Sequence, residues 1–436
     1  MRISVIGTGY LGAVHAAGMA DLGYDVVGID VDEPKIEALN AAKAPIHEPG
    51  LNELLETHVA SGRLRFTTDF SAAADADVHF ICVGTPQLPG RLDADMRYVD
   101  AAVEALAPLL TGDALVVGKS TVPVGTADRL AKRMAGLVPP GSTAELAWNP
   151  EFLREGFAVE DTLRPDRLVF GVRSKNAEDR LREIYATALA ADTPLVVTDF
   201  ETAELVKVSA NAFLATKISF INAMSEICER VGADVTKLAD AIGYDERIGR
   251  KFLNAGIGFG GGCLPKDIRA FIARAGELGQ GQSLNFLVEV DRVNLRRRTH
   301  VTDLTRQLLH GSAAGQNVAV LGAAFKPNSD DVRDSPALNV AGQLHLQGAH
   351  VTVYDPEANE NARANFPTLA YAGSALEACR DADVVLHLTE WSEFRELDPA
   401  ELGEVVRSRN VIDGRNCLDV EAWRAAGWNY RGLGRP

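Results

Sequence analysis

The sequence predicts an α/β protein with two doubly wound, Rossmann-like domains joined by a central helical domain that contains a long helix. Short apolar runs alternate with amphipathic stretches in the first and last parts of the chain, which is typical of parallel strands connected by helices. Between these parts, residues 201–231 contain neither proline nor glycine. We therefore expect a Rossmann-like domain over residues 1–197, a central helical domain over 198–310 and a second Rossmann-like domain over 315–436.

The strands of the first domain are predicted from apolar runs that are too short for helices. These runs are residues 3–6, 26–29, 78–83, 115–117, 146–148, 168–170 and 195–197. The chain then continues as one helix to residue 231, which would be roughly 45 Å long. Because this helix is apolar on most faces, we expect it to pack between domains or against a second copy of the chain.

A second long helix is predicted over residues 284–309, and the Gly-Ser-Ala-Ala-Gly run at 311–315 is expected to be a hinge. Further strands are predicted at residues 317–321, 350–354, 384–388 and 410–412. In sheets of this kind ligands bind beyond the carboxyl ends of the strands. Two such domains facing one another would enclose one shared cleft, which suits an enzyme with two substrates.

Composition and charge exclude several classes of protein. The chain has 436 residues, 44 of them basic and 60 acidic, for a net charge of −16. This charge argues against nucleic-acid and anionic-membrane partners. The five cysteines form no CxxC pair, so they fit neither a disulfide framework nor a zinc site. Without a long apolar run or a signal sequence, we expect a soluble, cytoplasmic protein with reduced thiols and no metal.

A glycine motif near the N-terminus predicts a dinucleotide site. Gly7, Gly9 and Gly12 follow the first strand and open a helix, so a pyrophosphate can approach the backbone at the helix N-terminus. Asp30 ends the second strand, where a carboxylate can bind a ribose hydroxyl. Its charge would repel a 2′-phosphate, which favours NAD over NADP, although Lys35 lies nearby. The ordinary alternative is a glycine turn with an acidic residue there by chance.

Cys263 is the candidate nucleophile. It follows residues 256–262, which contain five glycines and so suggest backbone close to a ligand. Pro265 is a plausible first helical residue, so Cys263 would lie at a helix N-terminus near Lys266, and both influences favour the thiolate. The alternative is a small buried residue. We expect that role for Cys82, Cys228 and Cys379.

Taken in order, these and further motifs resemble the NAD-dependent nucleotide-sugar 6-dehydrogenases over nearly the whole chain. The resemblance is carried by residues 7–12, 83–86, 119–123, 149–156, 204–207 with Asn211, 258–267, 325–326, 333–336 and 413–415. It implies a four-electron oxidation of the sugar's primary alcohol at carbon 6, using two NAD. Because one nicotinamide accepts one hydride, the aldehyde must be held between steps. A thiolate at Cys263 would hold it as a thiohemiacetal, then as a thioester that water hydrolyses.

The resemblance also implies catalytic roles. Lys207 and Asn211, one turn apart on one helix face, would stabilise developing oxygen charge. Glu151 would be the acid/base, and Thr121 with Asp267 would position a water; the acceptor of the first proton is left open. Without the resemblance, we would assign Glu151 to a helix cap and Asp267 to favourable contact with a helix dipole. Lys207 and Asn211 need partners in any case, because their helix is otherwise apolar.

The resemblance further assigns two sets of binding residues. The NAD site would comprise Gly7, Gly9, Tyr10, Leu11, Gly12, Asp30, Lys35, Thr85, Thr121, Glu155, Lys266 and Arg333. The nucleotide-sugar would contact Glu151, Phe152, Leu153, Lys207, Asn211, Phe252, Leu253, Asn254, Ala255, Gly256, Gly260, Lys326 and Arg415, with Arg247 reaching a substrate in a neighbouring subunit. Lys326 and Arg415 follow predicted strands, where positive groups can meet a diphosphate. Arg333 could instead be a solvated loop residue. Gly262 departs from the serine most often expected before the cysteine.

Several alternatives stay open at this point. UDP-glucose is favoured as substrate by residues 247–249, 252–262 and 413–415, with GDP-mannose and UDP-N-acetylmannosamine as alternatives. A two-electron hydroxy-acid dehydrogenase would not need Cys263 or a third domain. An NAD-sensing or redox-sensing binding protein would leave Lys207, Asn211 and Glu151 without a task. We expect a homodimer built on the long helix, or a higher homo-oligomer.

Overall fold

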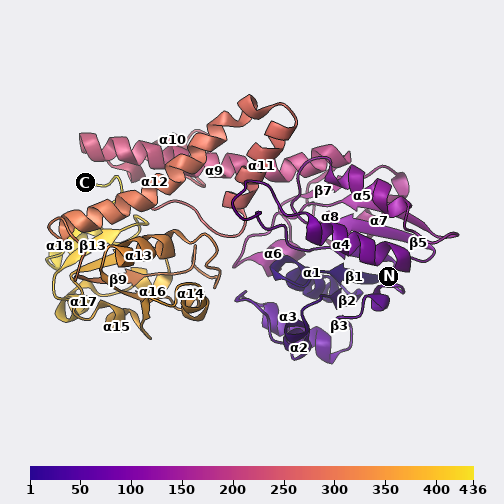
Figure 1. Ribbon diagram of the computed structural model, residues 1–436, viewed down its shortest axis with the longest axis horizontal. Helices are drawn as coiled ribbons and strands as arrows, with labels where there is room; N and C mark the ends of the chain where they lie inside the picture. The colour runs from indigo at the N-terminus through magenta and orange to yellow at the C-terminus, as the bar shows by residue number, and fades with distance from the viewer. The chain divides into compact units, whose positions relative to one another are not determined.

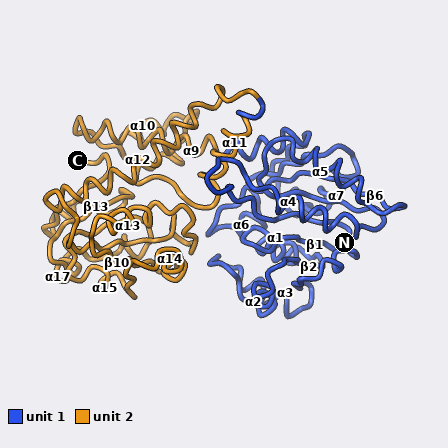
Figure 2. Tube along the Cα trace, viewed as in Figure 1, with its two compact units in different colours: residues 1–210, 276–278 blue, residues 211–275, 279–436 orange.

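The computed structural model describes residues 1–436, which divide into two compact units (Figure 2). The first unit comprises residues 1–210 and 276–278, and the second comprises residues 211–275 and 279–436. The division falls within one helix, α9 (Phe200–Val231), so the chain passes between the units without leaving helical structure. The three-domain division expected from the sequence remains a prediction.

The first unit is built on an eight-stranded sheet with the order β3-β2-β1-β4-β5-β6-β7-β8. Its strands are β1 (Arg2–Ile6), β2 (Asp25–Ile29), β3 (Leu64–Thr67), β4 (Val78–Ile81), β5 (Asp113–Gly118), β6 (Thr143–Trp148), β7 (Leu168–Gly171) and β8 (Leu195–Thr198). The order reverses between β1 and β4, which creates a ligand-binding crevice at the carboxyl ends of these strands in doubly wound folds. The dinucleotide motif follows β1 and therefore lies at this reversal.

Helices cover both faces of this sheet (Figure 1). Alternate strand residues point to opposite faces, so Ile3 and Val5 join one core and Ile6 joins the other. The first core includes α1 (Tyr10–Asp21) and α3 (Leu51–Ala60), and the second includes α4 (Arg97–Leu106) and α5 (Thr126–Ala135). Burial on both faces explains why the strands read as continuous apolar runs.

The structure differs from the sheet expected from the sequence in one strand direction and in one additional strand, which pairs parallel. β7 pairs antiparallel with β6 through Trp148 and Gly171. The intervening helix α6 (Ala158–Leu163) packs against α1, so this segment does not serve as the covering helix of a parallel crossover. β3 was not expected because its buried and exposed residues alternate, as is typical of an edge strand, and no apolar run marks it.

Four helices follow the first sheet. Both long helices predicted from the sequence are confirmed, as α9 and as α12 (Asn285–Leu308). The shorter helices are α10 (Val235–Gly243) and α11 (Leu264–Glu277). A small apolar cluster holds α9, α11 and α12 together in the second unit; it includes Ala212, Ala215, Ile268, Leu287 and Val290. None of the helices is long and apolar enough to cross a membrane.

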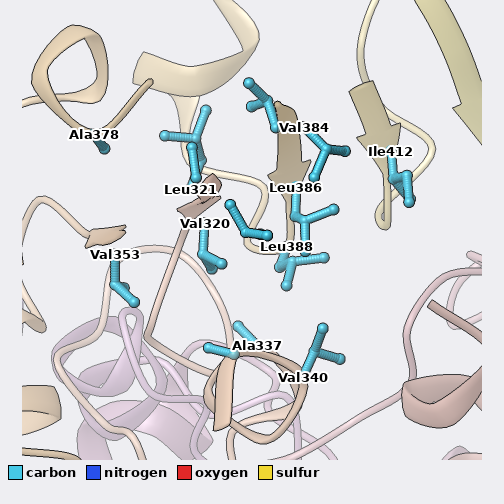
Figure 3. Close-up of a cluster of buried hydrophobic side chains, with 14 of the residues drawn as sticks. Val320, Leu321, Ala337, Val340, Val353, Ala378, Val384, Leu386, Leu388 and Ile412 are labelled. Atoms are coloured by element: carbon cyan, nitrogen blue, oxygen red, sulfur yellow. The ribbon is translucent and has the colours of Figure 1, made fainter. Parts of the chain in front are cut away.

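The second unit ends in a six-stranded parallel sheet with the order β11-β10-β9-β12-β13-β14. Its strands are β9 (Asn317–Leu321), β10 (His350–Tyr354), β11 (Ala370–Tyr371), β12 (Val384–His387), β13 (Asn410–Asp413) and β14 (Asn429–Gly432). Val320, Leu386 and Ile412 from three of these strands belong to its core, together with residues of α13 (Pro336–Leu346) (Figure 3). The fold class is confirmed. β11 and β14 were not predicted, because β11 has two residues and β14 has no apolar run.

Candidate active site

The turn between β1 and α1 has the geometry of a dinucleotide-binding loop. Gly7 has φ +87°, which favours glycine, and a Cβ on Gly12 would lie 1.7 Å from the Gly7 carbonyl oxygen. A Cβ on Gly9 would meet nothing within 4 Å, so the outer side of the turn is open to a ligand. Tyr10 and Leu11 begin α1, which has no side-chain cap and no acidic residue in its first turn. Its first N–H groups therefore suit an anionic pyrophosphate.

Asp30 is held as a carboxylate beside this turn. Its Oδ2 accepts hydrogen bonds from the Thr8 N–H at 2.7 Å and from Lys35 Nζ at 3.0 Å. Burial alone would raise the pKa of Asp30, but these bonds and the Lys35 charge outweigh it and lower the pKa. This carboxylate can accept a hydrogen bond from a ribose hydroxyl of NAD. The residues present therefore fit NAD.

Glu48 links the dinucleotide turn to residues 149–156, and sequence reasoning missed it. The Tyr10 hydroxyl donates to Glu48, whose carboxylate also accepts the N–H groups of Gly156 at 2.6 Å and Ala158 at 2.7 Å. Burial, followed by the Glu48 contact, raises the pKa of Tyr10, so the phenol stays protonated. A glutamate in a loop carries no sequence signal for this role; burial reveals it.

The ends of β4 and β5 bring two predicted NAD residues together. Thr85 follows β4 and Thr121 follows β5, and the Thr85 hydroxyl donates to the Thr121 carbonyl oxygen at 2.8 Å. Glu155, also predicted to contact NAD, is buried. Nearby, Glu204 accepts the N–H groups of Gly125 at 2.7 Å and Ala127 at 2.6 Å, which caps the N-terminus of α5.

Glu151 and Lys207 form a buried ion pair in the first unit. Lys207 Nζ lies 3.0 Å from Glu151 Oε1, and the two side chains are 7% and 12% exposed. Glu151 also accepts the Leu153 N–H at 2.8 Å, and Lys207 Nζ lies 5.5 Å from the centre of the Phe152 ring. Charges buried to this degree require such partners. Glu151 accepts from a loop amide here, so the expected alternative, a helix cap, is wrong.

A second group of predicted residues meets at the start of α11. Cys263 is exposed and directly precedes this fourteen-residue helix, and its carbonyl oxygen accepts the Asp267 N–H at 3.0 Å. The buried carboxylate of Asp267 accepts from Asn211 Nδ2 and pairs with Lys266 Nζ, both at 2.6 Å. The helix terminus favours the thiolate form of Cys263.

The other cysteines are unsuited to nucleophilic attack. Cys82, Cys228 and Cys379 are buried, as expected, and Cys417 is partly buried. Burial raises the pKa of three of these thiols to about 12, namely Cys82, Cys379 and Cys417. Those groups stay protonated at neutral pH.

Arg333 and Gly262 fit against one another. A Cβ on Gly262 would lie 2.2 Å from the Arg333 guanidinium carbon. The guanidinium also pairs with Asp331 at 2.6 Å, and its side chain is 61% exposed. A serine at 262 would require the Arg333 guanidinium to shift, and this guanidinium is the exposed end of a flexible side chain, so the structure gives no steric reason for the departure from the serine expected there.

The predicted substrate residues of the second unit fall into two groups. Leu253, Ala255, Gly256 and Gly260 are buried, whereas Arg247, Phe252 and Asn254 are exposed. The Arg415 guanidinium donates to the carbonyl oxygens of Leu388 at 2.8 Å, Gly258 at 3.0 Å and Phe325 at 3.2 Å. It thus joins the loop that precedes Cys263 to the loops that follow β9 and β12. Lys326 Nζ lies 5.5 Å from the centre of the Phe325 ring, beside this junction.

His387, Asp413 and Cys417 lie close enough to hold a metal ion. Asp413 already accepts hydrogen bonds from His387 Nδ1 at 2.9 Å, the N–H groups of Arg415 at 3.1 Å and Leu418 at 2.8 Å, and the Tyr430 hydroxyl at 2.9 Å. These donors satisfy both carboxylate oxygens. The cluster is therefore a hydrogen-bonded centre that shapes the turn carrying Arg415.

Comparison with known proteins decides the family. Models of the UDP-glucose/GDP-mannose dehydrogenase family match residues 1–189 as its NAD binding domain, 201–296 as its central domain and 319–420 as its UDP binding domain. The chain belongs to the UDP-glucose/GDP-mannose dehydrogenase family. It is thus an NAD-dependent oxidoreductase with a domain that binds a UDP-sugar.

Relatives of this dehydrogenase family match the chain from end to end. A UDP-glucose 6-dehydrogenase of Rhizobium meliloti is 44% identical over 100% of both chains. The UDP-glucose 6-dehydrogenase TuaD of Bacillus subtilis is 43% identical over 100% of this chain and 93% of its own. Among solved structures, a UDP-glucose dehydrogenase from Pyrobaculum islandicum has a TM-score of 0.91 at 40% identity, covering 100% of this chain and 98% of its own.

The same dehydrogenase fold serves other sugars. A UDP-D-ManNAc dehydrogenase from Pyrococcus horikoshii has a TM-score of 0.87 at 28% identity, covering 100% of this chain and 99% of its own. Fold alone therefore does not select the sugar.

Proposed function

We propose that the chain oxidises UDP-glucose to UDP-glucuronate in two NAD-dependent steps, with Cys263 holding the sugar between them. The single observation that carries this proposal is an exposed thiol at the N-terminus of α11, beside the hydrogen-bonded group of Asp267, Asn211 and Lys266. The relatives named for UDP-glucose, at 43% and 44% identity, support this sugar over the others.

The proposed chemistry begins at carbon 6 of the sugar. Bound NAD accepts a hydride in each of the two oxidations. In the first, the hydroxyl loses its proton to a base and carbon 6 loses a hydride, which gives an aldehyde. The Cys263 thiolate then adds to the aldehyde carbon, and the oxygen takes up a proton.

The second oxidation and hydrolysis regenerate the thiol. The thiohemiacetal loses its hydroxyl proton and a hydride, which leaves a thioester on Cys263. Water adds to the carbonyl carbon, the carbon–sulfur bond breaks, and the carboxylate leaves with the thiolate restored. Glu151 would accept the water proton, while Lys207 and Asn211 would stabilise the negative oxygen. Thr121 and Asp267 would position the water.

Initial rates with UDP-glucose, GDP-mannose and UDP-N-acetylmannosamine, measured side by side, test the substrate. We expect the highest kcat/KM with UDP-glucose and two NADH for each sugar consumed. Cys263→Ser should abolish acid formation, whereas Cys417→Ser should not, because Cys417 is a partly buried, protonated thiol. One NADH per sugar would favour a two-electron dehydrogenase, and none would favour a sensor.

We also propose a homodimer built on α9. Phe213, Phe220 and Ile227 recur every seven residues on this helix and are 67%, 49% and 54% exposed. Residues at this spacing lie on one side of a helix and form an apolar stripe. Such a stripe is typical of an interface between protein chains.

The remaining proposals concern organisation and location. We propose a division of labour among residues 1–197 for NAD, 198–310 for catalysis and assembly, and 315–436 for the UDP-sugar, which the three family matches support. A cytoplasmic location is supported by five free cysteines, none of them in a disulfide.

A further inference from the structure

The loop at residues 256–262, which leads into Cys263, is an irregular segment inside the second unit. Residues 256–261 are all buried, yet the loop forms neither helix nor strand. Buried N–H and C=O groups must find hydrogen-bond partners, and here no ladder supplies them. The partners are instead side chains of α9 and α12, the turn that carries Arg415, whose Gly414 carbonyl oxygen accepts the Ile257 N–H at 2.8 Å, and the loop that carries Arg333.

Asn294 makes the most specific of these contacts. This fully buried side chain lies on α12. Its Oδ1 accepts the Phe259 N–H at 2.7 Å, and its Nδ2 donates to the Phe259 carbonyl oxygen at 2.9 Å. One side chain thereby satisfies both backbone groups of one loop residue, in the manner of a neighbouring strand.

Two further buried side chains hold the beginning of the same loop. Asn222 on α9 is fully buried, and its Oδ1 accepts the Gly256 N–H at 2.8 Å. Arg297, one turn along α12 from Asn294, is also fully buried and donates from Nε to the Gly256 carbonyl oxygen at 3.3 Å. The loop is therefore anchored at Gly256 and again at Phe259.

The glycines leave the loop little freedom to shift from these anchors. Gly258 has φ +98°, and a Cβ there would lie 2.4 Å from Asn294 Oδ1. A Cβ on Gly260 would lie 2.3 Å from the Asp334 carbonyl oxygen. The Gly261 N–H donates to the Arg333 carbonyl oxygen at 2.8 Å. The Asn294 side chain and the backbone of Arg333 and Asp334 therefore confine the path from Gly258 to Gly261.

Arg298 joins this loop to the one that carries Arg333. Its side chain is 3% exposed, and its NH2 donates to the Phe259 carbonyl oxygen at 3.1 Å. Its NH1 pairs with Asp334 at 2.7 Å. Asn294 and Arg298 lie one helical turn apart on α12, so one face of this helix sets the position of both loops.

We propose that Asn294 is a positioning residue for Cys263, acting through the backbone of residues 256–262. This inference rests on the proposed role of Cys263 in holding the aldehyde. Asn294 touches neither substrate nor cofactor in this account. It fixes Phe259, and the confined glycines transmit that position to the thiol. A displacement of about 1 Å at a reacting atom can cost roughly 10²-fold in rate.

The test uses Asn294→Ala and Asn294→Ser in the full-length chain. Misplacing the thiol should impair capture of the aldehyde more than the first oxidation. We expect the rate of acid formation to fall by about 10- to 100-fold for Asn294→Ala. The NADH formed per UDP-glucose consumed should also fall below two, because aldehyde escapes. Asn294→Ser keeps one hydroxyl for one of the two backbone groups and should lie between Ala and the wild type.

The matched control is Thr305→Val. Thr305 is fully buried on the same helix, and its hydroxyl donates only within α12, to the Val301 carbonyl oxygen at 2.8 Å. This variant should keep two NADH per sugar. Partial unfolding would lower the rate of acid formation but leave two NADH per sugar. A ratio of two NADH per UDP-glucose in Asn294→Ala, whatever its turnover rate, would therefore overturn the proposal.

Amide hydrogen exchange tests the positioning without turnover. In the wild type the Phe259 and Gly261 amides should be protected, and Asn294→Ala should remove the protection of Phe259 while Thr305→Val retains it. An unprotected Phe259 amide in the wild type would overturn the inference whether or not either variant folds. Absence of UDP-glucose oxidation by the wild type would instead refute the proposed function, and the exchange measurement would still decide the role of Asn294.

Discussion

Lys207 and Asn211 are two buried polar residues on helix α9. The structure pairs Lys207 with Glu151 and Asn211 with Asp267. The sequence indicated that these residues need partners, since unpaired polar groups are costly to bury. It did not indicate that the partners would be two other candidate catalytic residues.

Replacement of Lys207 by Met should lower kcat by about 10²- to 10³-fold, because a positive group that stabilises a negative oxygen is lost. The control is Lys132→Met, since the Lys132 side chain is 74% exposed and pairs only within its own helix, with Asp128. Steady-state NADH formation, with thermal unfolding as a check of folding, measures the effect. A kcat within twofold of the wild type would remove Lys207 from the chemistry.

Asp413 should make the free energy of unfolding of the second unit depend on pH. Burial would raise the pKa of Asp413, but the hydrogen bond and charge of His387, with the Leu418 and Tyr430 contacts, outweigh it and lower the pKa. A lowered carboxyl pKa contributes stability above the unfolded value, about 3.9, which is lost as the pH falls through the folded value.

Asp413→Asn should therefore be less stable than the wild type at pH 7, and the difference should shrink below about pH 3.9. Tryptophan fluorescence during urea unfolding can follow this, because Trp391, Trp423 and Trp428 belong to the C-terminal core. A difference that stays constant from pH 7 to pH 2 would contradict the assignment.

At the scale of elements, two glycines in the turn between β1 and α1 should have different roles, Gly12 in folding and Gly9 in NAD binding. Gly12→Ala places a Cβ against the Gly7 carbonyl oxygen, so it should destabilise the first unit by about 1–3 kcal/mol. Gly9→Ala meets no protein atom within 4 Å, so it should fold normally and raise the KM for NAD. Thermal unfolding and NAD titration of both variants measure this. Equal effects of the two substitutions on NAD binding with no loss of stability would contradict it.

Element prediction succeeded where burial is strong on both faces of a segment. β1, β2, β4 and β5 read directly from apolar runs because helices cover both sides of the sheet. It failed at three of the four sheet edges: β3 alternates, β11 has two residues, and β14 has a single buried residue. The fourth edge, β8, was predicted because residues 195–197 form an apolar run, although Val196 and Val197 are exposed. The antiparallel direction of β7 could not be predicted from the local sequence pattern either, since the path of the segment before β7 depends on contacts with α1.

The same contrast holds for the candidate site. Glycine spacing, Asp30 and Cys263 carry local signals, such as a turn that excludes side chains or a cysteine before a helix. Glu48 and Asn294 have no such signal, because their importance lies in backbone groups distant along the chain that they satisfy. Buried side chains that bind loop backbone become visible only in three dimensions.

At the scale of the whole molecule, we expect two copies to associate through α9. Phe220→Glu would place a charge in the middle of the exposed apolar stripe and should convert a dimer to a monomer. Light scattering at several concentrations measures the mass. Tyr98→Glu is the control, because Tyr98 is 54% exposed and belongs to α4 rather than to α9. A wild-type mass equal to one chain at all concentrations would contradict the dimer.

The direct test of the central claim is mass spectrometry of the Cys263 peptide after rapid acid quench of a reaction with UDP-glucose and NAD. Glu151→Gln should slow hydrolysis and let the acyl group accumulate on this thiol. We expect a mass increase that corresponds to the UDP-glucuronyl group on Cys263, and none in Cys263→Ser. Acid formation without a sulfur-bound sugar, or an adduct on a different residue, would contradict the account.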